Sequence, residues 1–281
     1  MHGPSRPVPE SFYAAPDKCV ACGMCVDDCP AAIIAIDDGV AAVKPEDMEN
    51  CLGCQHCLAI CPTGAVEVAG RRPGSSRPLS PPDPQSLDLL VRGRRSVRKF
   101  SPHPVERELF DRVLETAAHA PTGVNSRDRL FTAILDSGVM AEYRDRACRA
   151  LVAGSDRMPE ELSWLVSAAS KWLDKGRDVI FRNAPHLIVV TSGPGASTGE
   201  ADCLIALSYF DLIAQANGIG TVWCGMADYM LRHLPETRRW LGIPDDHAMG
   251  YAMLFGMPDV FYARTAQYGP ESVSVIERLV D

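Results

Sequence analysis

Apolar positions in the larger, C-terminal part of the chain alternate between the spacing of a helix and that of strands. Val105, Leu109, Val113 and Ala117 recur every four residues, which predicts an amphipathic helix that ends before Pro121. Short apolar runs predict strands, the first two of them buried, at 131–135, 187–191, 221–223 and 248–255. This alternation predicts a mixed α+β layer fold.

A long apolar helix is expected between the second and third of these strands. Ser197 and Glu200 have the spacing of a capping box at its start. Asn217 and Gly218 predict where the helix ends, because both residue types adopt the left-handed conformation that closes helices.

The N-terminal part carries shorter elements. Two short strands, 33–37 and 40–43, are predicted around the turn Asp38-Gly39. Residues 70–86 hold five prolines with serine and glycine between them, which predicts a semi-extended linker. The sequence therefore predicts one domain at 1–69 and a second at 87–281.

The composition, 46% apolar and 23% charged over 281 residues, is that of a folded chain. No apolar run reaches the roughly 20 residues of a membrane span. Residues 1–16 hold three prolines in their first nine positions and do not resemble a signal peptide, so we expect a cytoplasmic protein. The 28 basic and 36 acidic residues give a net charge of −8, which excludes a general nucleic-acid binder.

Eleven cysteines without an expected export signal favour metal binding over disulfides. Eight of them form two sets of identical spacing, C-x2-C-x2-C-x3-C-P, which repeat after 32 residues. The first set is Cys19, Cys22, Cys25 and Cys29, and the second is Cys51, Cys54, Cys57 and Cys61.

This spacing suits iron–sulfur clusters, because three close thiolates wrap one face of a cluster and the fourth reaches the other cluster. It resembles that of bacterial two-cluster ferredoxins. The resemblance implies one [4Fe–4S] cluster on Cys19, Cys22, Cys25 and Cys61, and another on Cys51, Cys54, Cys57 and Cys29. A pair of structural zinc sites is the alternative, although zinc ribbons use two C-x2-C pairs that a longer span separates.

A basic segment and a loop hold further candidate chemistry. In the segment 93–100 (GRRSVRKF), arginines and Ser96 are side chains that bind phosphate through forked and hydroxyl hydrogen bonds; a solvated basic run is the alternative. The loop 120–125 (APTGVN) is a rigid turn whose Asn125 amide matches the donor–acceptor edge of a flat heterocycle.

These motifs, followed by a T-x-W-x-G-type segment at 221–225 and a late arginine, resemble the nitroreductase superfamily of FMN-dependent oxidoreductases from about residue 87 onward. The resemblance implies a nitroreductase-like α+β layer fold behind a small ferredoxin-like domain, and a homodimer with FMN at the interface. It places Arg94, Ser96 and Arg264 at the FMN phosphate. Arg95 would flank the flavin, and Arg98 would face its N1/O2 edge.

The remaining flavin contacts follow from the same resemblance. The other subunit would contribute Pro121, Thr122, Gly123 and Asn125. Cys224 and Gly225 occupy the positions from which the family donates a backbone N–H to flavin N5.

The sequence departs from the family at three places. After Asn125 it has Ser-Arg-Asp-Arg where the family often has N-x-Q-P-W, and Tyr262 replaces a basic residue. Arg127 and Arg129 therefore suggest an acceptor that carries a carboxylate or phosphate. The third departure is Cys224, whose thiol is either redox active or a buried apolar group, as expected for Cys148 and Cys203.

The two halves together predict that electrons pass from the clusters to FMN and on to an organic acceptor, a nitro compound, quinone or activated C=C bond. No catalytic side chain is required. Tyr143, Trp164 and Trp172 are candidates for the acceptor pocket, with core packing as the alternative. The expected donor is a ferredoxin, NADH or NADPH. Alternative functions are an NAD(P)H-driven nitroreductase with accessory clusters, an electron-carrier subunit, and a reductive dehalogenase.

Overall fold

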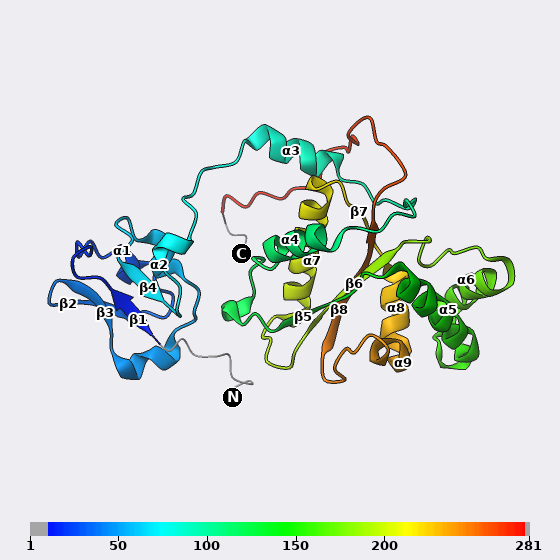
Figure 1. The fold of residues 1–281 in the computed structure, drawn as a ribbon, viewed down its shortest axis with the longest axis horizontal. Coiled ribbons are helices and arrows are strands. Elements are labelled where there is room, and N and C mark those ends of the chain that lie inside the picture. Colours follow the sequence, from blue (N-terminus) through cyan, green and yellow to red (C-terminus); the bar gives the residue numbers. More distant parts are fainter. Residues whose placement is uncertain (1–10, 279–281) are drawn as a thin grey trace.

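The computed structural model describes residues 11–278. Residues 1–10 and 279–281, at the outer ends of the two predicted domains, lie outside this description. A small N-terminal unit and a larger unit built on a sheet are joined by a stretch that carries helix α3 (Figure 1). Of the helices formed by residues 11–278, none has the length and apolar character needed to cross a membrane.

The small unit is made of two antiparallel strand pairs and two short helices. Its elements are β1 (Phe12–Ala14), α1 (Met24–Asp27), β2 (Ile34–Asp37), β3 (Val40–Val43), the 3-10 helix η1 (Pro45–Asn50), α2 (His56–Ile60) and β4 (Val66–Val68). Strand β2 pairs with β3 and β1 with β4. Their apolar side chains, with Leu58 of α2, form a small core.

The predicted hairpin at 33–43 is confirmed. Asp38 and Gly39 adopt positive φ angles of 46° and 80°, which is the conformation that a two-residue antiparallel turn requires. Strand β1 has no counterpart among the predicted elements, because three residues are too few to show a period.

The connecting stretch contains more structure than the composition predicts. A 3-10 turn, η2 (Pro73–Ser75), and the start of α3 (Pro84–Gly93) lie within the predicted linker. Helix α3 begins there because the Asp83 carboxylate accepts hydrogen bonds from the amides of Gln85 and Ser86, and Pro84 suits the first helical position.

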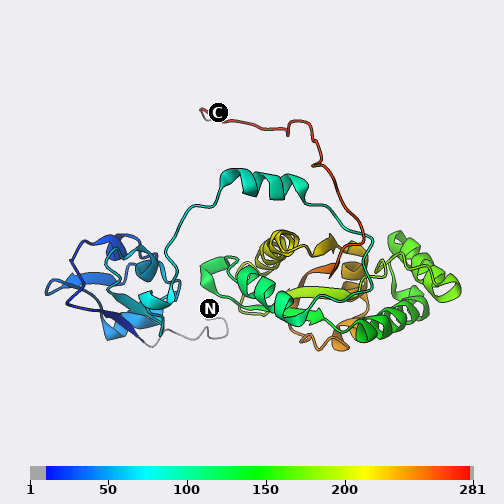
Figure 2. The same ribbon diagram turned by 45° about the horizontal axis from the view of Figure 1, so that its top comes forward.

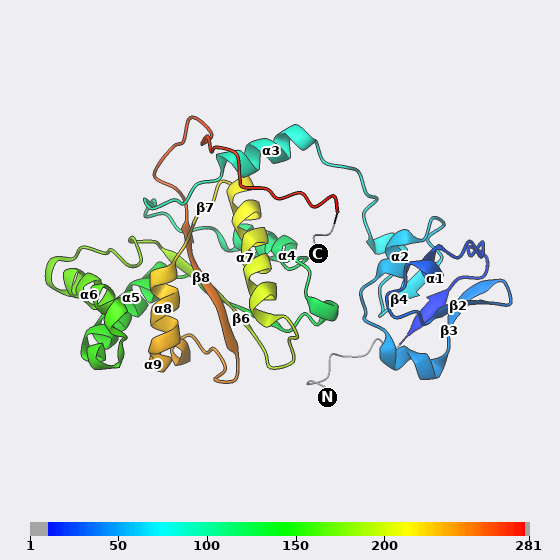
Figure 3. The ribbon, with the colours of Figure 1, turned by 180° about the vertical axis from the view of Figure 1, so that it is seen from behind.

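The larger unit is an antiparallel sheet in the order β5-β6-β8-β7 with helices on both faces. Figure 3 shows the same arrangement from behind. Its elements are α4 (Arg107–Ala117), the 3-10 turn η3 (Gly123–Asn125), β5 (Arg129–Ile134), α5 (Ser137–Ala153), the 3-10 turns η4 (Ser155–Arg157) and η5 (Glu160–Leu162), α6 (Ser163–Lys175), β6 (His186–Ser192), α7 (Gly199–Ala216), β7 (Gly220–Trp223), α8 (Gly225–His233), α9 (Pro235–Arg239) and β8 (Ala248–Gly256).

Two apolar cores separate the layers. Helices α4 and α7 pack on one face of the sheet, and α5, α6 and α8 pack on the other. Strand β6 is buried along its whole length, as predicted, because strands flank it on both sides and helices cover both faces. Strand β5 is only half-buried, contrary to prediction, because it lies at the edge of the sheet.

The capping box predicted for the long helix is wrong. Helix α7 has Thr198 as its N-cap residue, and no side chain caps its amides. The Thr198 hydroxyl instead donates to Asp202 Oδ1, at 2.9 Å, which also accepts a hydrogen bond from Gly123. The Thr198 bond stays within the first turn of the helix, whereas the Gly123 bond ties this turn to a distant loop. The predicted end at Asn217-Gly218 is confirmed, with Gly218 at φ 77°.

Candidate functional site

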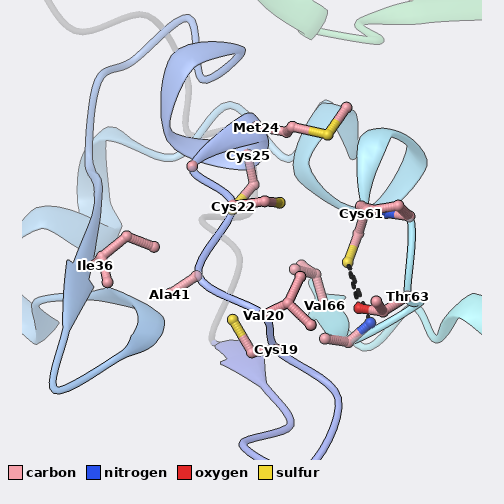
Figure 4. A pocket seen from close by; sticks show the side chains of 13 residues that line it. Cys19, Val20, Cys22, Met24, Cys25, Ile36, Ala41, Cys61, Thr63 and Val66 are labelled. Carbon is pink, nitrogen blue, oxygen red and sulfur yellow. Dashed lines mark hydrogen bonds between the residues drawn. The ribbon is translucent and has the colours of Figure 1, made fainter.

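Two hollows in the small unit are each lined by four thiols. Figure 4 shows the first, into which Cys19, Cys22 and Cys25 of one loop and Cys61 of the other point their sulfurs. The second is lined by Cys51, Cys54, Cys57 and Cys29. Each hollow thus combines three thiols of one loop with the fourth thiol of the other, which is the crossed grouping that the resemblance implied.

The loops wrap tightly because each helix that follows starts from a left-handed residue. Gly23 precedes α1 with φ 78°, and Gln55 precedes α2 with φ 65°. The His56 ring has its Nδ1 3.2 Å from Asp28 Oδ2, so this contact ties the two cysteine loops together.

The surrounding protein shifts the pKa values of the cysteine thiols in different directions. Burial raises the pKa of Cys57 to about 12. Burial also acts to raise the pKa of Cys61, but hydrogen bonds from the Ala65 amide, at 3.2 Å, and the Thr63 hydroxyl outweigh it and lower the pKa. Metal ligation requires thiolates, so these hydrogen bonds favour ligation at Cys61.

The donor set fits an iron–sulfur cluster. Each hollow offers four soft sulfur ligands, as [4Fe–4S] clusters require. Within residues 11–278, no three His, Cys, Asp or Glu side chains converge as ligands of a single metal ion would. The four thiols of each set instead surround a hollow, as the ligands of a multi-atom cluster would.

The basic segment after α3 lies along strand β7. Ser96 forms a parallel bridge with Thr221, and the Val97 amide donates to the Thr221 carbonyl at 2.8 Å. This pairing places Ser96, two residues after Arg94, beside the strand that leads through Cys224 to Gly225. The predicted phosphate and N5 contacts therefore belong to one structural unit.

A buried carboxylate on α7 organises this unit. Asp211, 4% exposed, lies 3.6 Å from Arg94 Nη1 and accepts hydrogen bonds from the Thr221 hydroxyl and from the Trp223 indole, the latter at 3.2 Å. The Gln215 amide links Asp211, at 3.3 Å, to the Arg95 carbonyl, at 3.0 Å. Sequence reasoning missed Asp211, whose one signal was an acidic residue inside an apolar helix.

The other predicted arginines differ in their surroundings. The Arg95 guanidinium donates to the carbonyls of Arg92 and Arg94 at the end of α3, where a cation complements the helix dipole. Arg98 is exposed and donates to the Ser96 carbonyl at 3.3 Å. Arg264 is exposed in the extended segment after β8.

Cys224 and Gly225 stand at the start of α8. The Cys224 amide already donates to the Ala252 carbonyl at 2.9 Å, whereas first-turn amides such as that of Gly225 have no partner within the helix. The Cys224 amide is thus already used, and the prediction of an N5 donor rests on Gly225. The Cys224 thiol is buried, and burial raises its pKa to about 11, as it does for Cys203; for Cys148 it reaches about 12.

The loop 121–127 is strained and anchored. Val124, Asn125 and Arg127 have positive φ angles of 47°, 53° and 52°, which cost free energy in residues with side chains. The Gly123 amide donates to Asp202 Oδ1 at 3.0 Å, and the Arg127 amide donates to the Thr122 hydroxyl at 3.0 Å. These bonds hold the strained conformation.

Asp202 and Asp211 attach the two parts of the predicted flavin site to opposite halves of α7. They lie nine positions apart in the helix, which corresponds to about 14 Å along its axis. One chain thus presents two separate half-sites, a phosphate half with Arg94 and a loop half with Asn125. The assignment of the loop to the other subunit's flavin stays a prediction.

The residues proposed to bind an acceptor have structural partners. Arg127 and Arg129 both donate to the Ala118 carbonyl, at 3.2 and 3.1 Å, and Arg129 donates also to Ala120. Tyr143 is buried in the core, so the packing interpretation holds for it. Trp172 packs against the same core, with the Arg144 guanidinium 5.5 Å from its ring centre, while Trp164 is 46% exposed.

Comparisons with known proteins agree with both units. Residues 91–257 match the model of the Nitroreductase family, and residues 18–65 match the 4Fe-4S dicluster domain. Among solved structures, a nitroreductase with bound FMN from Bacteroides fragilis has a TM-score of 0.54 at 23% identity and covers 67% of this chain and 98% of its own. One from Desulfitobacterium hafniense, also with bound FMN, has a TM-score of 0.53 at 24% identity and covers 69% and 98%. These likenesses concern the fold.

Curated relatives match over short segments. A subunit of an ion-translocating oxidoreductase complex from Methanosarcina acetivorans is 38% identical over 50 residues, 18% of each chain. The chain spans about a fifth of the length of the first curated relatives that it matches. The family match, by contrast, covers more than half of this chain. The chain therefore belongs to the nitroreductase family, a family of oxidoreductases, and carries a 4Fe-4S dicluster domain ahead of that fold.

Proposed function

We propose that this protein is an FMN-dependent oxidoreductase whose two [4Fe–4S] clusters deliver electrons to the flavin, which reduces a small organic acceptor. The observation that carries the proposal is the crossed grouping of eight thiols around two hollows in the chain that also forms the nitroreductase fold. When bound, the clusters supply single electrons and the flavin exchanges one or two.

The chain's own part is to hold and tune these groups. Arg94 and Ser96 are placed along β7 to bind the phosphate, and Asp211 fixes the direction of the Arg94 guanidinium. Arg98 supplies positive charge for the flavin edge, and the Gly225 amide supplies the hydrogen bond to N5. In this proposal two copies of the chain complete the site, as the resemblance implies, with the loop half of one copy serving the flavin held by the phosphate half of the other.

An anaerobic spectral titration tests the proposal. The purified protein is titrated separately with NADH, with NADPH and with reduced ferredoxin, while flavin and cluster absorption are followed. We expect reduced ferredoxin to bleach the clusters and then the flavin. Bleaching of the flavin by NADH or NADPH alone would instead indicate an NAD(P)H-driven nitroreductase with accessory clusters. A starting spectrum without flavin or cluster absorption would contradict the proposal.

A further inference from the structure

The small unit and the loop half-site are joined by a hydrogen bond. The Asn125 side-chain Nδ2 donates to the Leu52 backbone carbonyl at 2.9 Å, across 73 residues of sequence. Figures 1 and 2 both show the segment that carries η3 facing the small unit. This bond connects the two predicted domains at a residue that the resemblance places at the flavin.

Leu52 belongs to only one of the two cysteine hollows. It lies between Cys51 and Cys54 in sequence and lines the hollow of Cys29, Cys51, Cys54 and Cys57, but it is not among the residues around the other hollow. The contact therefore distinguishes two sites that the repeated cysteine spacing leaves equivalent.

The strain in the loop is concentrated at this contact. Asn125 and its neighbour Val124 both adopt the left-handed conformation, which is costly for a β-branched residue. Such strain persists only where surrounding bonds enforce it, and it gathers at functional positions. Here the Gly123–Asp202 bond on one side and the bond to Leu52 on the other hold the Asn125 amide in place.

We propose that the cluster on Cys29, Cys51, Cys54 and Cys57 is the one that passes electrons to the flavin, and that Asn125 is the positioning residue that docks it. This inference rests on the proposed function. Each transfer oxidises the cluster by one electron and reduces the flavin by one; two transfers, with protons from water, complete the reduction. The other cluster receives its electrons from an external one-electron carrier such as reduced ferredoxin.

Removal of one cluster at a time tests which cluster passes electrons to the flavin. Full-length protein with FMN is prepared as Cys54→Ser, Cys22→Ser and the double variant, and iron and FMN contents verify that each retains the other groups. A reduced viologen supplies electrons, and stopped-flow absorption follows flavin bleaching. The double variant measures direct reduction of the flavin by the viologen.

We expect Cys22→Ser to bleach the flavin more slowly than the wild type but clearly faster than the double variant, because the viologen also reaches the remaining cluster. We expect Cys54→Ser to bleach it only at the rate of the double variant. The reverse order, or equal rates in the two single variants, would overturn the inference. A wild-type rate no faster than that of the double variant would instead refute cluster-to-flavin transfer itself, so the two failures are distinguishable.

A second experiment tests the docking bond without removing a cluster. Asn125→Asp places a carboxylate against the Leu52 carbonyl, where no donor remains, while Asn217→Asp makes the same change at the exposed end of α7. In excess FMN, with iron content unchanged, we expect Asn125→Asp to slow flavin bleaching at least tenfold and to raise the radius of gyration measured by small-angle X-ray scattering. A rate and a radius equal to those of Asn217→Asp would overturn the role of Asn125.

Discussion

Oδ2 of Asp211 lies 3.6 Å from Nη1 of Arg94, so a carboxylate buried inside the fold directs an arginine that is 30% exposed. The same carboxylate binds Thr221 and Trp223 of β7. Three elements, α7, β7 and the segment after α3, therefore meet at one charged side chain. The phosphate half-site depends on this meeting.

Asp211→Asn should weaken FMN binding. The amide lacks the negative charge that orients Arg94 and turns an NH₂ group toward donors, so we expect FMN affinity to fall about tenfold and the free energy of unfolding to fall by about 2 kcal/mol. Flavin fluorescence titration and urea unfolding measure the two effects. The matched control is Asp88→Asn, whose pair with Arg92 is exposed to solvent and is expected to contribute little to stability. Equal effects in the two variants would contradict a special role for Asp211.

Gly123→Ala should displace the strained loop. A Cβ atom at this position would lie 2.2 Å from the Thr198 hydroxyl oxygen, which is already bonded to Asp202. We expect the free energy of unfolding to fall by about 1–3 kcal/mol, as for other overpacked sites, and FMN retention to fall with it. Gly93→Ala is the control, because a Cβ there meets nothing within 4 Å. Partial recovery in Gly123→Ala/Thr198→Ala would show that the clash causes the loss.

If each cluster takes three thiols from one repeat and the fourth from the other, double cysteine variants should lose iron in a specific pattern. Cys29 and Cys54 line the same hollow, so Cys29→Ser/Cys54→Ser should lose about half of the bound iron, no more than either single variant. Cys22 and Cys29 line different hollows although they belong to the same sequence repeat, so Cys22→Ser/Cys29→Ser should lose nearly all of it. Iron and sulfide analysis of purified protein gives the answer. If each repeat bound its own cluster, the results of the two double variants would be exchanged.

The Cys224 thiol should be inert. It is 4% exposed, burial raises its pKa to about 11, and it donates to the Ile180 carbonyl at 3.4 Å. Because thiolates rather than thiols react, we expect iodoacetamide to leave Cys224 unmodified in the folded protein at pH 7.5, and Cys224→Ala to retain turnover. Peptide mass spectrometry reads the labelling, and the same protein unfolded in guanidinium is the control. Labelling of the folded protein at the rate of the unfolded one would restore the redox-active interpretation.

His186 should make stability fall with acid. The ring is fully buried, and its Nε2 accepts a hydrogen bond from the Val105 amide at 2.8 Å. Burial lowers its pKa to about 4, below the value of about 6.5 in the unfolded chain. Between these values the unfolded state binds the extra proton, so the free energy of unfolding falls as pH falls from 6.5 toward 4, by up to about 3 kcal/mol.

Urea unfolding at pH 7.5 and 5.5 measures this dependence. His186→Gln keeps an acceptor near the Val105 amide but does not titrate, and all of its other titratable groups are those of the wild type. Its free energy of unfolding should therefore fall less between the two pH values than that of the wild type. A loss of equal size in both proteins would show that other groups cause the acid sensitivity.

Much of the small unit follows from local sequence. The cysteine spacing predicts which thiols share a loop, and Asp38-Gly39 predicts the hairpin, because both depend on residues a few positions apart. The strand pattern of the larger unit also follows from its apolar runs, and the structure confirms each of the four strands with small shifts at the ends.

The contacts that assemble the site required the tertiary structure. Asp202 and Asp211 are acidic residues in an apolar helix, and only packing shows that they face Gly123 and Arg94. The sequence pattern at Ser197 predicted a local cap, yet Thr198 is the N-cap residue, and the Asp202 carboxylate beside it accepts a hydrogen bond from the distant Gly123.

The partner of Asn125 is a further example. The cysteine sets, the order of strands along the chain and the family motifs could be predicted from the sequence, because these depend on spacing between near neighbours. Only the tertiary structure placed Asn125 on Leu52, beside one cysteine set rather than the other. The two repeats share one cysteine spacing, so the spacing does not distinguish them, and a contact between residues 73 positions apart does.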